Sequence, residues 1–215
     1  MKTNQTEFWS GQFGAEYTDR NTPSTLKAWD DNYITNYGIT RSEMFSQLFE
    51  GIDKNIKILE VGCNSGLQLA GLQAVGFKNL YGIELQSYAV EVSKTITKGI
   101  NIIQGNAFDI PFKDNYFDLV MTNGVLIHIS PTDLPKALKE IERCSKQYIM
   151  GFEYFAEEIT DVKYRGNEGF LWKADYAQIY QEQFKNLTLS KNIKYPYLTE
   201  QEKGNIDNLF LLEKK

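Results

Sequence analysis

Residues 56–66 constrain the fold of this chain more than any other segment. They read IKILEVGCNSG, an apolar, β-branched run followed by a short loop that Gly62 and Gly66 bracket. A helical pattern begins at Leu67, so the segment predicts a strand, a tight loop and a helix. Such a unit suits a nucleotide, because glycine lets the backbone approach a ligand and the first helical turn presents free N–H groups.

The spacing of the glycines in this loop limits which nucleotide ligands it could bind. A dinucleotide fingerprint requires Gly-x-Gly-x-x-Gly, whereas Asn64 and Leu67 stand at the second and third glycine positions. Asparagine tolerates left-handed backbone angles better than most residues, so Asn64 is compatible with a tight loop. An ordinary strand-to-helix turn without a ligand remains the alternative at this point.

Strands and helices alternate along the chain. We expect strands at residues 56–61, 79–84, 100–104, 117–122 and 147–152, with helices between them, then a helix at 174–184 and strands at 187–193 and 208–212. This alternation predicts an α/β fold with a doubly wound, mostly parallel sheet and right-handed crossovers. Ligands of such sheets bind beyond the carboxyl ends of the strands, near the switch point.

The N-terminal residues 1–39 precede this pattern and are polar but rich in aromatic side chains. No clean helical or strand period runs through them. We interpret them as a short helical lid over the main domain, with a packed extension that touches no ligand as the equal alternative. A helix follows from Thr40, where Thr40 and Glu43 form a capping-box pattern, and should pack on the sheet.

The amino-acid composition limits the kinds of molecule that this chain could bind. The 215 residues fit one domain, 1–215, and their net charge of −5 argues against nucleic acid and anionic membranes, which require clustered Lys and Arg. Cys63, Cys144 and the single histidine, His128, predict no disulfide framework and no metal site. No signal-peptide core or bilayer-spanning run is visible, so we expect a cytoplasmic protein.

The predicted strand ends carry a coherent set of polar residues. Glu84 ends the second strand, where a carboxylate binds both hydroxyls of a ribose and repels a 2′-phosphate. Asn106 and Ala107 follow the third strand and suit an adenine edge, with Leu85 or Phe108 stacked on the ring. Asn123 and Gly124 follow the fourth and form a turn.

Glu60-Val61-Gly62-Cys63-Asn64-Ser65-Gly66 resembles the first motif of class I S-adenosylmethionine-dependent methyltransferases, acid-x-Gly-x-Gly-x-Gly, with only the middle glycine changed. The resemblance spans residues 56–128, the cofactor-binding half, and implies a Rossmann-like, seven-stranded sheet with an antiparallel last strand. It implies S-adenosylmethionine as cofactor, with S-adenosylhomocysteine as product. The contacts it implies come from Gly62, Cys63, Asn64, Gly66, Glu84, Leu85, Asn106, Ala107 and Asn123.

The flanks are similar to methyltransferases associated with the biosynthesis of pseudaminic acid and related sugars. The similarity is carried by residues 8–21, 124–129, 153–155, 164–166 and 171–175. It implies a small, sugar-derived or related acceptor, which we expect to be anionic. That family is defined by its association with sugar pathways, so the similarity supports the reaction type more firmly than the substrate.

Candidate roles follow from this chemistry. His128 lies just past the fourth strand and is the candidate base, because histidine titrates near neutral pH; a structural histidine bonded to the backbone is the alternative. Substrate recognition is expected from the lid and from an insert at 153–173. We assign Tyr17 and Arg20 to the cofactor, and the acceptor to Tyr154, Tyr164, Arg165 and Trp172, while either arginine could instead form a structural ion pair.

Two other functions remain open from the sequence. One is a cofactor-binding regulatory protein of the same fold without turnover. The other is a sugar-nucleotide-modifying α/β enzyme that uses another nucleotide cofactor, against which the broken dinucleotide pattern argues. The sequence does not identify the acceptor atom or the oligomeric state.

Overall fold

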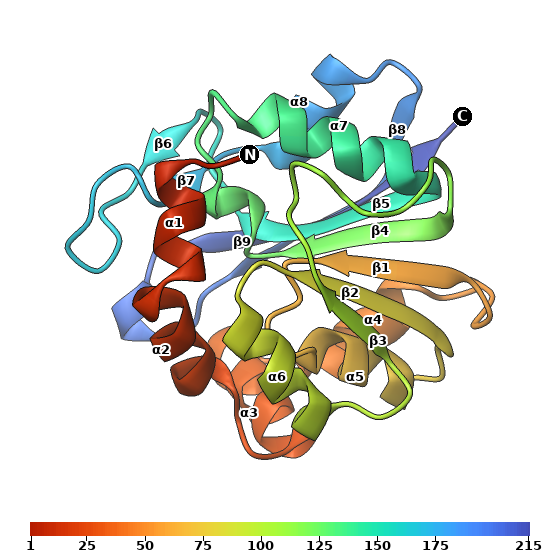
Figure 1. The fold of residues 1–215 in the computed structure, drawn as a ribbon, viewed down its shortest axis with the longest axis horizontal. Helices are drawn as coiled ribbons and strands as arrows, with labels where there is room; N and C mark the ends of the chain where they lie inside the picture. The colour runs from red at the N-terminus through yellow and green to blue at the C-terminus, as the bar shows by residue number, and fades with distance from the viewer.

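The computed structural model describes residues 1–215 and contains a seven-stranded sheet in the order β3-β2-β1-β4-β5-β9-β8 (Figure 1). Its strands are β1 (Lys57–Val61), β2 (Asn79–Glu84), β3 (Asn101–Gln104), β4 (Phe117–Asn123), β5 (Ser145–Tyr154), β8 (Leu187–Pro196) and β9 (Ile206–Lys214). The first five pair in parallel, whereas β9 runs antiparallel to both β5 and β8. The predicted Rossmann-like α/β sheet with an antiparallel last strand is confirmed.

Helices cover both faces of the sheet (Figure 1). The side chains of α7 (Leu134–Cys144) and α8 (Tyr176–Gln183) pack on one face, in a core that includes Val120 and Ile149. On the other face, α3 (Leu26–Tyr37), α4 (Arg41–Leu48) and α5 (Leu67–Ala74) pack on a core that includes Ile58 and Met121. The central strands β1, β4 and β5 are buried on both faces, as expected for parallel strands with near-continuous apolar runs.

The loop between β1 and α5 has the geometry that its glycines predict. Gly62, Asn64 and Gly66 all adopt positive φ, with values of 71°, 47° and 81°. Gly66 caps α5, and a Cβ there would lie 2.7 Å from the Cδ1 of Ile102. Asn64 therefore takes the left-handed conformation expected of it, and the loop keeps its shape without a middle glycine.

The first 37 residues form helices despite their irregular pattern: α1 (Asn4–Ser10), α2 (Gln12–Asn21) and α3. Thr3 caps α1 and Thr25 caps α3, each with its side-chain oxygen. The predicted capping box at Thr40 and Glu43 starts α4. The period is unclear because α1 buries no residue and α2 buries only Gly14 and Thr18, so neither helix has an apolar stripe.

The remaining elements lie near the carboxyl ends of the strands. A one-turn helix, η1 (Leu126–His128), follows β4, and a short hairpin of β6 (Thr160–Asp161) and β7 (Trp172–Lys173) lies within residues 153–173. Figure 1 shows α1 and α2, in red, at one end of the sheet beside this hairpin. The helix α6 (Ser87–Ile96) joins β2 to β3, and η2 (Glu200–Glu202) precedes β9. None of the helices has the length and apolar character needed to cross a bilayer.

Candidate active site

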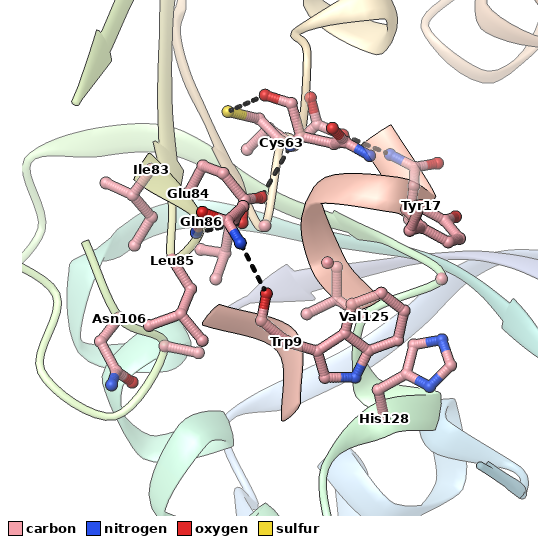
Figure 2. A pocket seen from close by; sticks show the side chains of 18 of the residues that line it. Trp9, Tyr17, Cys63, Ile83, Glu84, Leu85, Gln86, Asn106, Val125 and His128 are labelled. Carbon is pink, nitrogen blue, oxygen red and sulfur yellow. Dashed lines mark hydrogen bonds between the residues drawn. The ribbon is translucent and has the colours of Figure 1, made fainter. Parts of the chain in front are cut away.

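A cavity of about 240 Å³ lies beyond the carboxyl ends of β1, β2 and β4. The glycine loop after β1, the end of β2 with the start of α6, and the loops after β3 and β4 form its walls (Figure 2). Gln5, Thr6 and Trp9 of α1 and Tyr17 of α2 close it from the N-terminal side. The topology thus brings four separate strand ends to one site, at the switch point between β1 and β4.

Glu84 occupies the end of β2, and its carboxylate faces this cavity. One oxygen, Oε2, accepts a hydrogen bond from the backbone N–H of Asn64 at 2.8 Å, and Oε1 accepts one from the backbone N–H of Gln86 at 2.8 Å. Burial raises the pKa of Glu84, although these backbone N–H groups act in the opposite direction. Each carboxylate oxygen can accept a further bond, so Glu84 is anchored and still able to bind hydroxyl groups.

Glu60, at the end of β1, forms the second acidic position of the cavity. Its Oε1 accepts a hydrogen bond from the Asn123 amide at 3.1 Å, while its Oε2 is buried without a partner. The Asn123 amide oxygen in turn accepts from Arg41, a fully buried arginine of α4. Burial raises the pKa of Glu60 to about 8. A cationic ligand group beside Oε2 would stabilise the ionised carboxylate.

The N-terminal helices are fastened to the loops that form this cavity. The Thr18 hydroxyl donates to the Asn64 side chain at 2.9 Å, and the Thr22 hydroxyl donates to Ser65 at 3.0 Å. The side-chain amide of Gln86, the N-cap residue of α6, donates to the carbonyl oxygens of Ser10 at 2.9 Å and Gly11 at 2.7 Å. We call residues 1–22 the lid. It contacts the cavity directly, which favours the lid interpretation over an extension remote from any ligand.

His128 lies at the end of η1, where it borders this cavity and a second one. Its Nδ1 lies 2.8 Å from the carbonyl oxygen of Phe170. A carbonyl only accepts, so Nδ1 carries the hydrogen and the neutral ring keeps the lone pair on Nε2. Burial lowers the pKa of His128 to about 4. The indole of Trp9 packs 4.4 Å from the imidazole, centroid to centroid (Figure 2).

The second cavity, of about 510 Å³, adjoins the first and shares Tyr17, Asn123, Gly124 and His128 with it. Tyrosine is its most prominent side chain. Tyr33 and Tyr37 come from α3, and Tyr154, Tyr164 and Tyr197 come from β5 and the later loops. Asp207 and Arg20 are its charged residues. The cavity therefore offers aromatic faces, hydroxyl groups and one charge of each sign.

The structure brings most of the predicted site residues together. The first cavity is lined by Tyr17, Gly62, Cys63, Asn64, Glu84, Leu85, Asn106, Ala107, Asn123 and His128. Gly66 lies behind the loop as the cap of α5. Arg20, assigned to the cofactor, lines the second cavity instead, beside Tyr154 and Tyr164.

Two residues assigned to the acceptor lie outside both cavities. Arg165 is exposed and adopts a positive φ of 47° in the turn after Tyr164. Trp172 is buried in β7, with 8% of its surface exposed, and pairs with Asp161 of β6. The sequence around each of them gives no sign of which side chains turn inward. Their substrate roles remain predictions without a cavity contact.

Several site residues have no distinctive sequence signal. Arg41 lies inside a capping box and Gln86 precedes a helix. Local helix formation accounts for both residues, so neither pattern indicates a role at the site. Asp207 is the second residue of β9 and follows an ordinary polar loop. Only Glu60 carries a signal, because it is the acid of the glycine-loop motif. The others reach the site through tertiary packing, which periodicity does not report.

The site has the groups that S-adenosylmethionine requires. A ribose needs an acceptor for its two hydroxyls, and Glu84 has free lone pairs on both oxygens. An ammonium group needs an anionic acceptor, and the buried Oε2 of Glu60 has no other partner. No group of three or more His, Cys, Asp or Glu side chains is arranged to hold a metal ion. The residues present therefore fit this cofactor.

Comparison with known proteins agrees with the geometry. A methyltransferase domain family matches residues 59–148. The demethylmenaquinone methyltransferase of Staphylococcus aureus strain MRSA252 is 36% identical over 101 residues, 45% of this chain and 41% of that protein. An uncharacterized protein of Haemophilus influenzae is 28% identical over 102 residues, with the same coverage. The match thus spans less than half the length of these relatives.

Solved structures extend the similarity to nearly the whole fold. A SAM-dependent methyltransferase from Aquifex aeolicus superposes with a TM-score of 0.61 at 19% identity, covering 89% of this chain and 98% of the other. One from Methanosarcina mazei gives a TM-score of 0.64 at 16% identity, covering 78% and 96%. Residues 59–148 of this chain therefore match a methyltransferase domain family, and the chain has the Rossmann-like fold of these solved structures.

Proposed function

We propose that this chain transfers a methyl group from S-adenosylmethionine to a small polar metabolite, sugar-derived or related. One observation carries the proposal: the cavity that holds Glu84 and the glycine loop opens onto a second cavity through the shared residues Asn123, Gly124 and His128. When bound, the cofactor supplies a methyl carbon on a sulfonium. An enzyme of this kind mainly aligns the acceptor with that carbon and excludes water.

The first cavity would hold the cofactor along its length. Glu84 accepts hydrogen bonds from the ribose hydroxyls, since its oxygens are fixed by Asn64 and Gln86. Glu60 and Asn123 face the amino-acid part, where Glu60 provides an acceptor for the ammonium group. The lid, fastened to Asn64 and Gln86, covers the site and limits access of water.

His128 would take the proton of the acceptor. The lone pair of Nε2 is available because Nδ1 donates to the Phe170 carbonyl. A pKa near 4 keeps the ring neutral at physiological pH, which is the form that accepts a proton, though it makes the histidine a weaker base than an unperturbed one. An acceptor hydroxyl in the second cavity, placed beside His128, would lose its proton as the new bond to carbon forms.

The second cavity supports a polar acceptor. Tyrosine hydroxyls and ring faces suit a sugar-like molecule, because they bind hydroxyl groups and pack against C–H surfaces. For an anionic group, as predicted from the sequence, Arg20 is the candidate partner on this cavity; its guanidinium lies 3.7 Å from Glu16 and 5.6 Å from the Phe13 ring. The demethylmenaquinone of the Staphylococcus relative is the substrate in that protein's name, and the tyrosine-rich wall here favours a more polar molecule.

Calorimetric titration tests the cofactor. We expect S-adenosylmethionine and S-adenosylhomocysteine to bind with micromolar affinity and NAD not to bind, because Glu84 suits a free ribose and the loop lacks the dinucleotide glycines. Binding of NAD alone would refute the proposal. Turnover is then followed as S-adenosylhomocysteine release across a panel of amino and neutral sugars and sugar acids. Binding without release across the whole panel would favour a regulatory protein of the same fold.

A further inference from the structure

Asp207 of β9 is a buried carboxylate on the wall of the second cavity. Only 5% of its surface is exposed, and the Tyr37 hydroxyl donates to its Oδ2 at 2.5 Å. None of the salt bridges in the structure includes it. A buried carboxylate without a cation is costly unless a ligand compensates it. This position therefore provides a negative charge that tyrosine hydroxyls bind but no cation neutralises, on the wall of a space large enough for a small molecule.

Three tyrosine rings that pack against one another line the same cavity as this carboxylate. The ring of Tyr37 lies 4.8 Å from that of Tyr197, and Tyr197 lies 5.8 Å from Tyr154, all centroid to centroid. The three tyrosines and Asp207 line the same cavity. Aromatic faces together with a carboxylate attract organic cations, because the negative face of each ring adds to the charge of the acid. An ammonium group is the ligand that this arrangement fits.

The neighbouring cations do not neutralise Asp207 directly. The Arg41 guanidinium is directed at Asn123 and Gln68 and lies 4.4 Å over the Phe152 ring. Lys173 donates to Asn205 and lies 5.3 Å from the centroid of the Tyr154 ring. Burial has the largest effect on Asp207 and raises its pKa to about 6, although hydrogen bonds from Tyr37 and Tyr197 and the charge of Arg41 favour the ionised form. The carboxylate is still ionised at neutral pH.

Asp207 and His128 lie at different places along the cavities, so they would contact opposite ends of a bound acceptor. His128 lies where the two cavities meet, whereas Asp207, Tyr154 and Tyr197 line the second cavity alone. We infer that the methyl acceptor carries a protonated amine, which binds Asp207 among Tyr37, Tyr154 and Tyr197, while the atom to be methylated lies beside His128. This inference rests on the proposed function. It assigns a positive charge to the end of the methyl acceptor that lies away from the methylated atom.

The test uses three probes of one shape and different charge: cyclohexylamine, cyclohexanol and cyclohexanecarboxylate. Each is titrated into the full-length protein saturated with S-adenosylhomocysteine, and binding is followed by tryptophan fluorescence, since Trp29 borders both cavities. At pH 7.5 we expect cyclohexylammonium to bind about ten- to a hundredfold more tightly than the other two, the ratio for a hydrogen bond to a charged group.

The variant Asp207→Asn keeps the shape and an oxygen acceptor for Tyr37, so it should bind amine and alcohol within about twofold of each other because the charged contact is gone. The matched control Asp53→Asn removes an exposed carboxylate outside both cavities and should keep the preference for the amine. Calorimetry with S-adenosylhomocysteine shows whether each variant is folded. If Asp207→Asn does not fold, the order of the three binding affinities on the unsubstituted protein still tests the inference.

Three results would overturn the inference: equal binding of the three probes, tighter binding of the carboxylate, or no binding of any. A preference for the amine that survives in Asp207→Asn would also overturn it. Failure of the proposed function looks different: the protein would then either not bind S-adenosylhomocysteine, or bind the cofactor and release no S-adenosylhomocysteine with any acceptor, whatever the order of the three probe affinities.

Discussion

Replacing Glu84 by alanine should weaken cofactor binding through a defined pair of interactions. Both oxygens of this carboxylate already accept a backbone hydrogen bond, from Asn64 and from Gln86, at 2.8 Å each. The ribose hydroxyls would occupy the remaining lone pairs. The substitution therefore removes the hydrogen bonds to the ligand and leaves two backbone N–H groups of the binding loop without their acceptor.

The size of the effect is set by the hydrogen bonds that the ribose would make to Glu84. A hydrogen bond to a charged group contributes about 1.5–3 kcal/mol, and water entering the space of the missing side chain recovers part of this energy. We expect the dissociation constant of S-adenosylhomocysteine to rise about ten- to a hundredfold, which corresponds to ~1.4–2.8 kcal/mol. The control Glu91→Ala removes an exposed acid of α6 that pairs with Lys94 and should change affinity by less than about twofold.

Calorimetry with two nucleosides isolates the ribose. Adenosine should bind the unsubstituted protein more tightly than 2′,3′-dideoxyadenosine, because only adenosine donates to Glu84. In Glu84→Ala the two should bind alike. If the variant still distinguishes them, or if a folded Glu84→Ala binds S-adenosylhomocysteine normally, the assignment of Glu84 to the ribose is wrong.

Three further substitutions test other parts of the site. His128→Gln should lower the turnover number by about 10²–10⁴-fold with unchanged cofactor affinity. The rate of the unsubstituted enzyme should fall only as the pH drops toward about 4, where the neutral base is lost. A rate that already falls near pH 6.5 would contradict the buried, neutral ring. Gly66→Ala places a Cβ 2.7 Å from Ile102 at a φ of 81° and should lower the free energy of unfolding, measured in urea, by about 2–3 kcal/mol. The control Gly99→Ala, at a φ of 71° with nothing within 4 Å, should lower it by only about 1 kcal/mol. Gln86→Ala removes the hydrogen bonds from the Gln86 amide to the carbonyl oxygens of Trp9, Ser10 and Gly11. It should speed limited proteolysis within residues 1–22 about five- to thirtyfold. An unchanged rate would show that these bonds do not hold the lid.

The sheet and the cofactor cavity were largely predictable because their signals are local. The apolar run before Gly62 identifies β1, and parallel strands place Glu84 and Asn123 at one edge whatever the loops do. The ends of β5, β8 and β9 extend beyond the predicted ranges, since pairing with neighbouring strands continues past the apolar positions that periodicity detects.

The acceptor side was less predictable because it depends on long-range packing. Asp207 meets Tyr37 across 170 positions of sequence, and neither residue has a local pattern that indicates the contact. Arg165 was assigned from its chemistry, but its turn directs it to the surface. The same reasoning explains Arg41: a charged residue in a capping box looks like a surface position, yet packing over Phe45 and Phe152 buries it completely.

The sparse burial of the lid has a consequence for its stability. Its helix α1 buries no residue, α2 buries only Gly14 and Thr18, and the bonds that fasten it are side-chain hydrogen bonds. Segments with few buried apolar contacts open with a free energy well below that of global unfolding. We therefore expect the lid to open separately from the core: its amides should exchange with solvent by local opening, while those of β1 and β4 should exchange only when the sheet unfolds. A ligand beneath it can leave without disturbing the core.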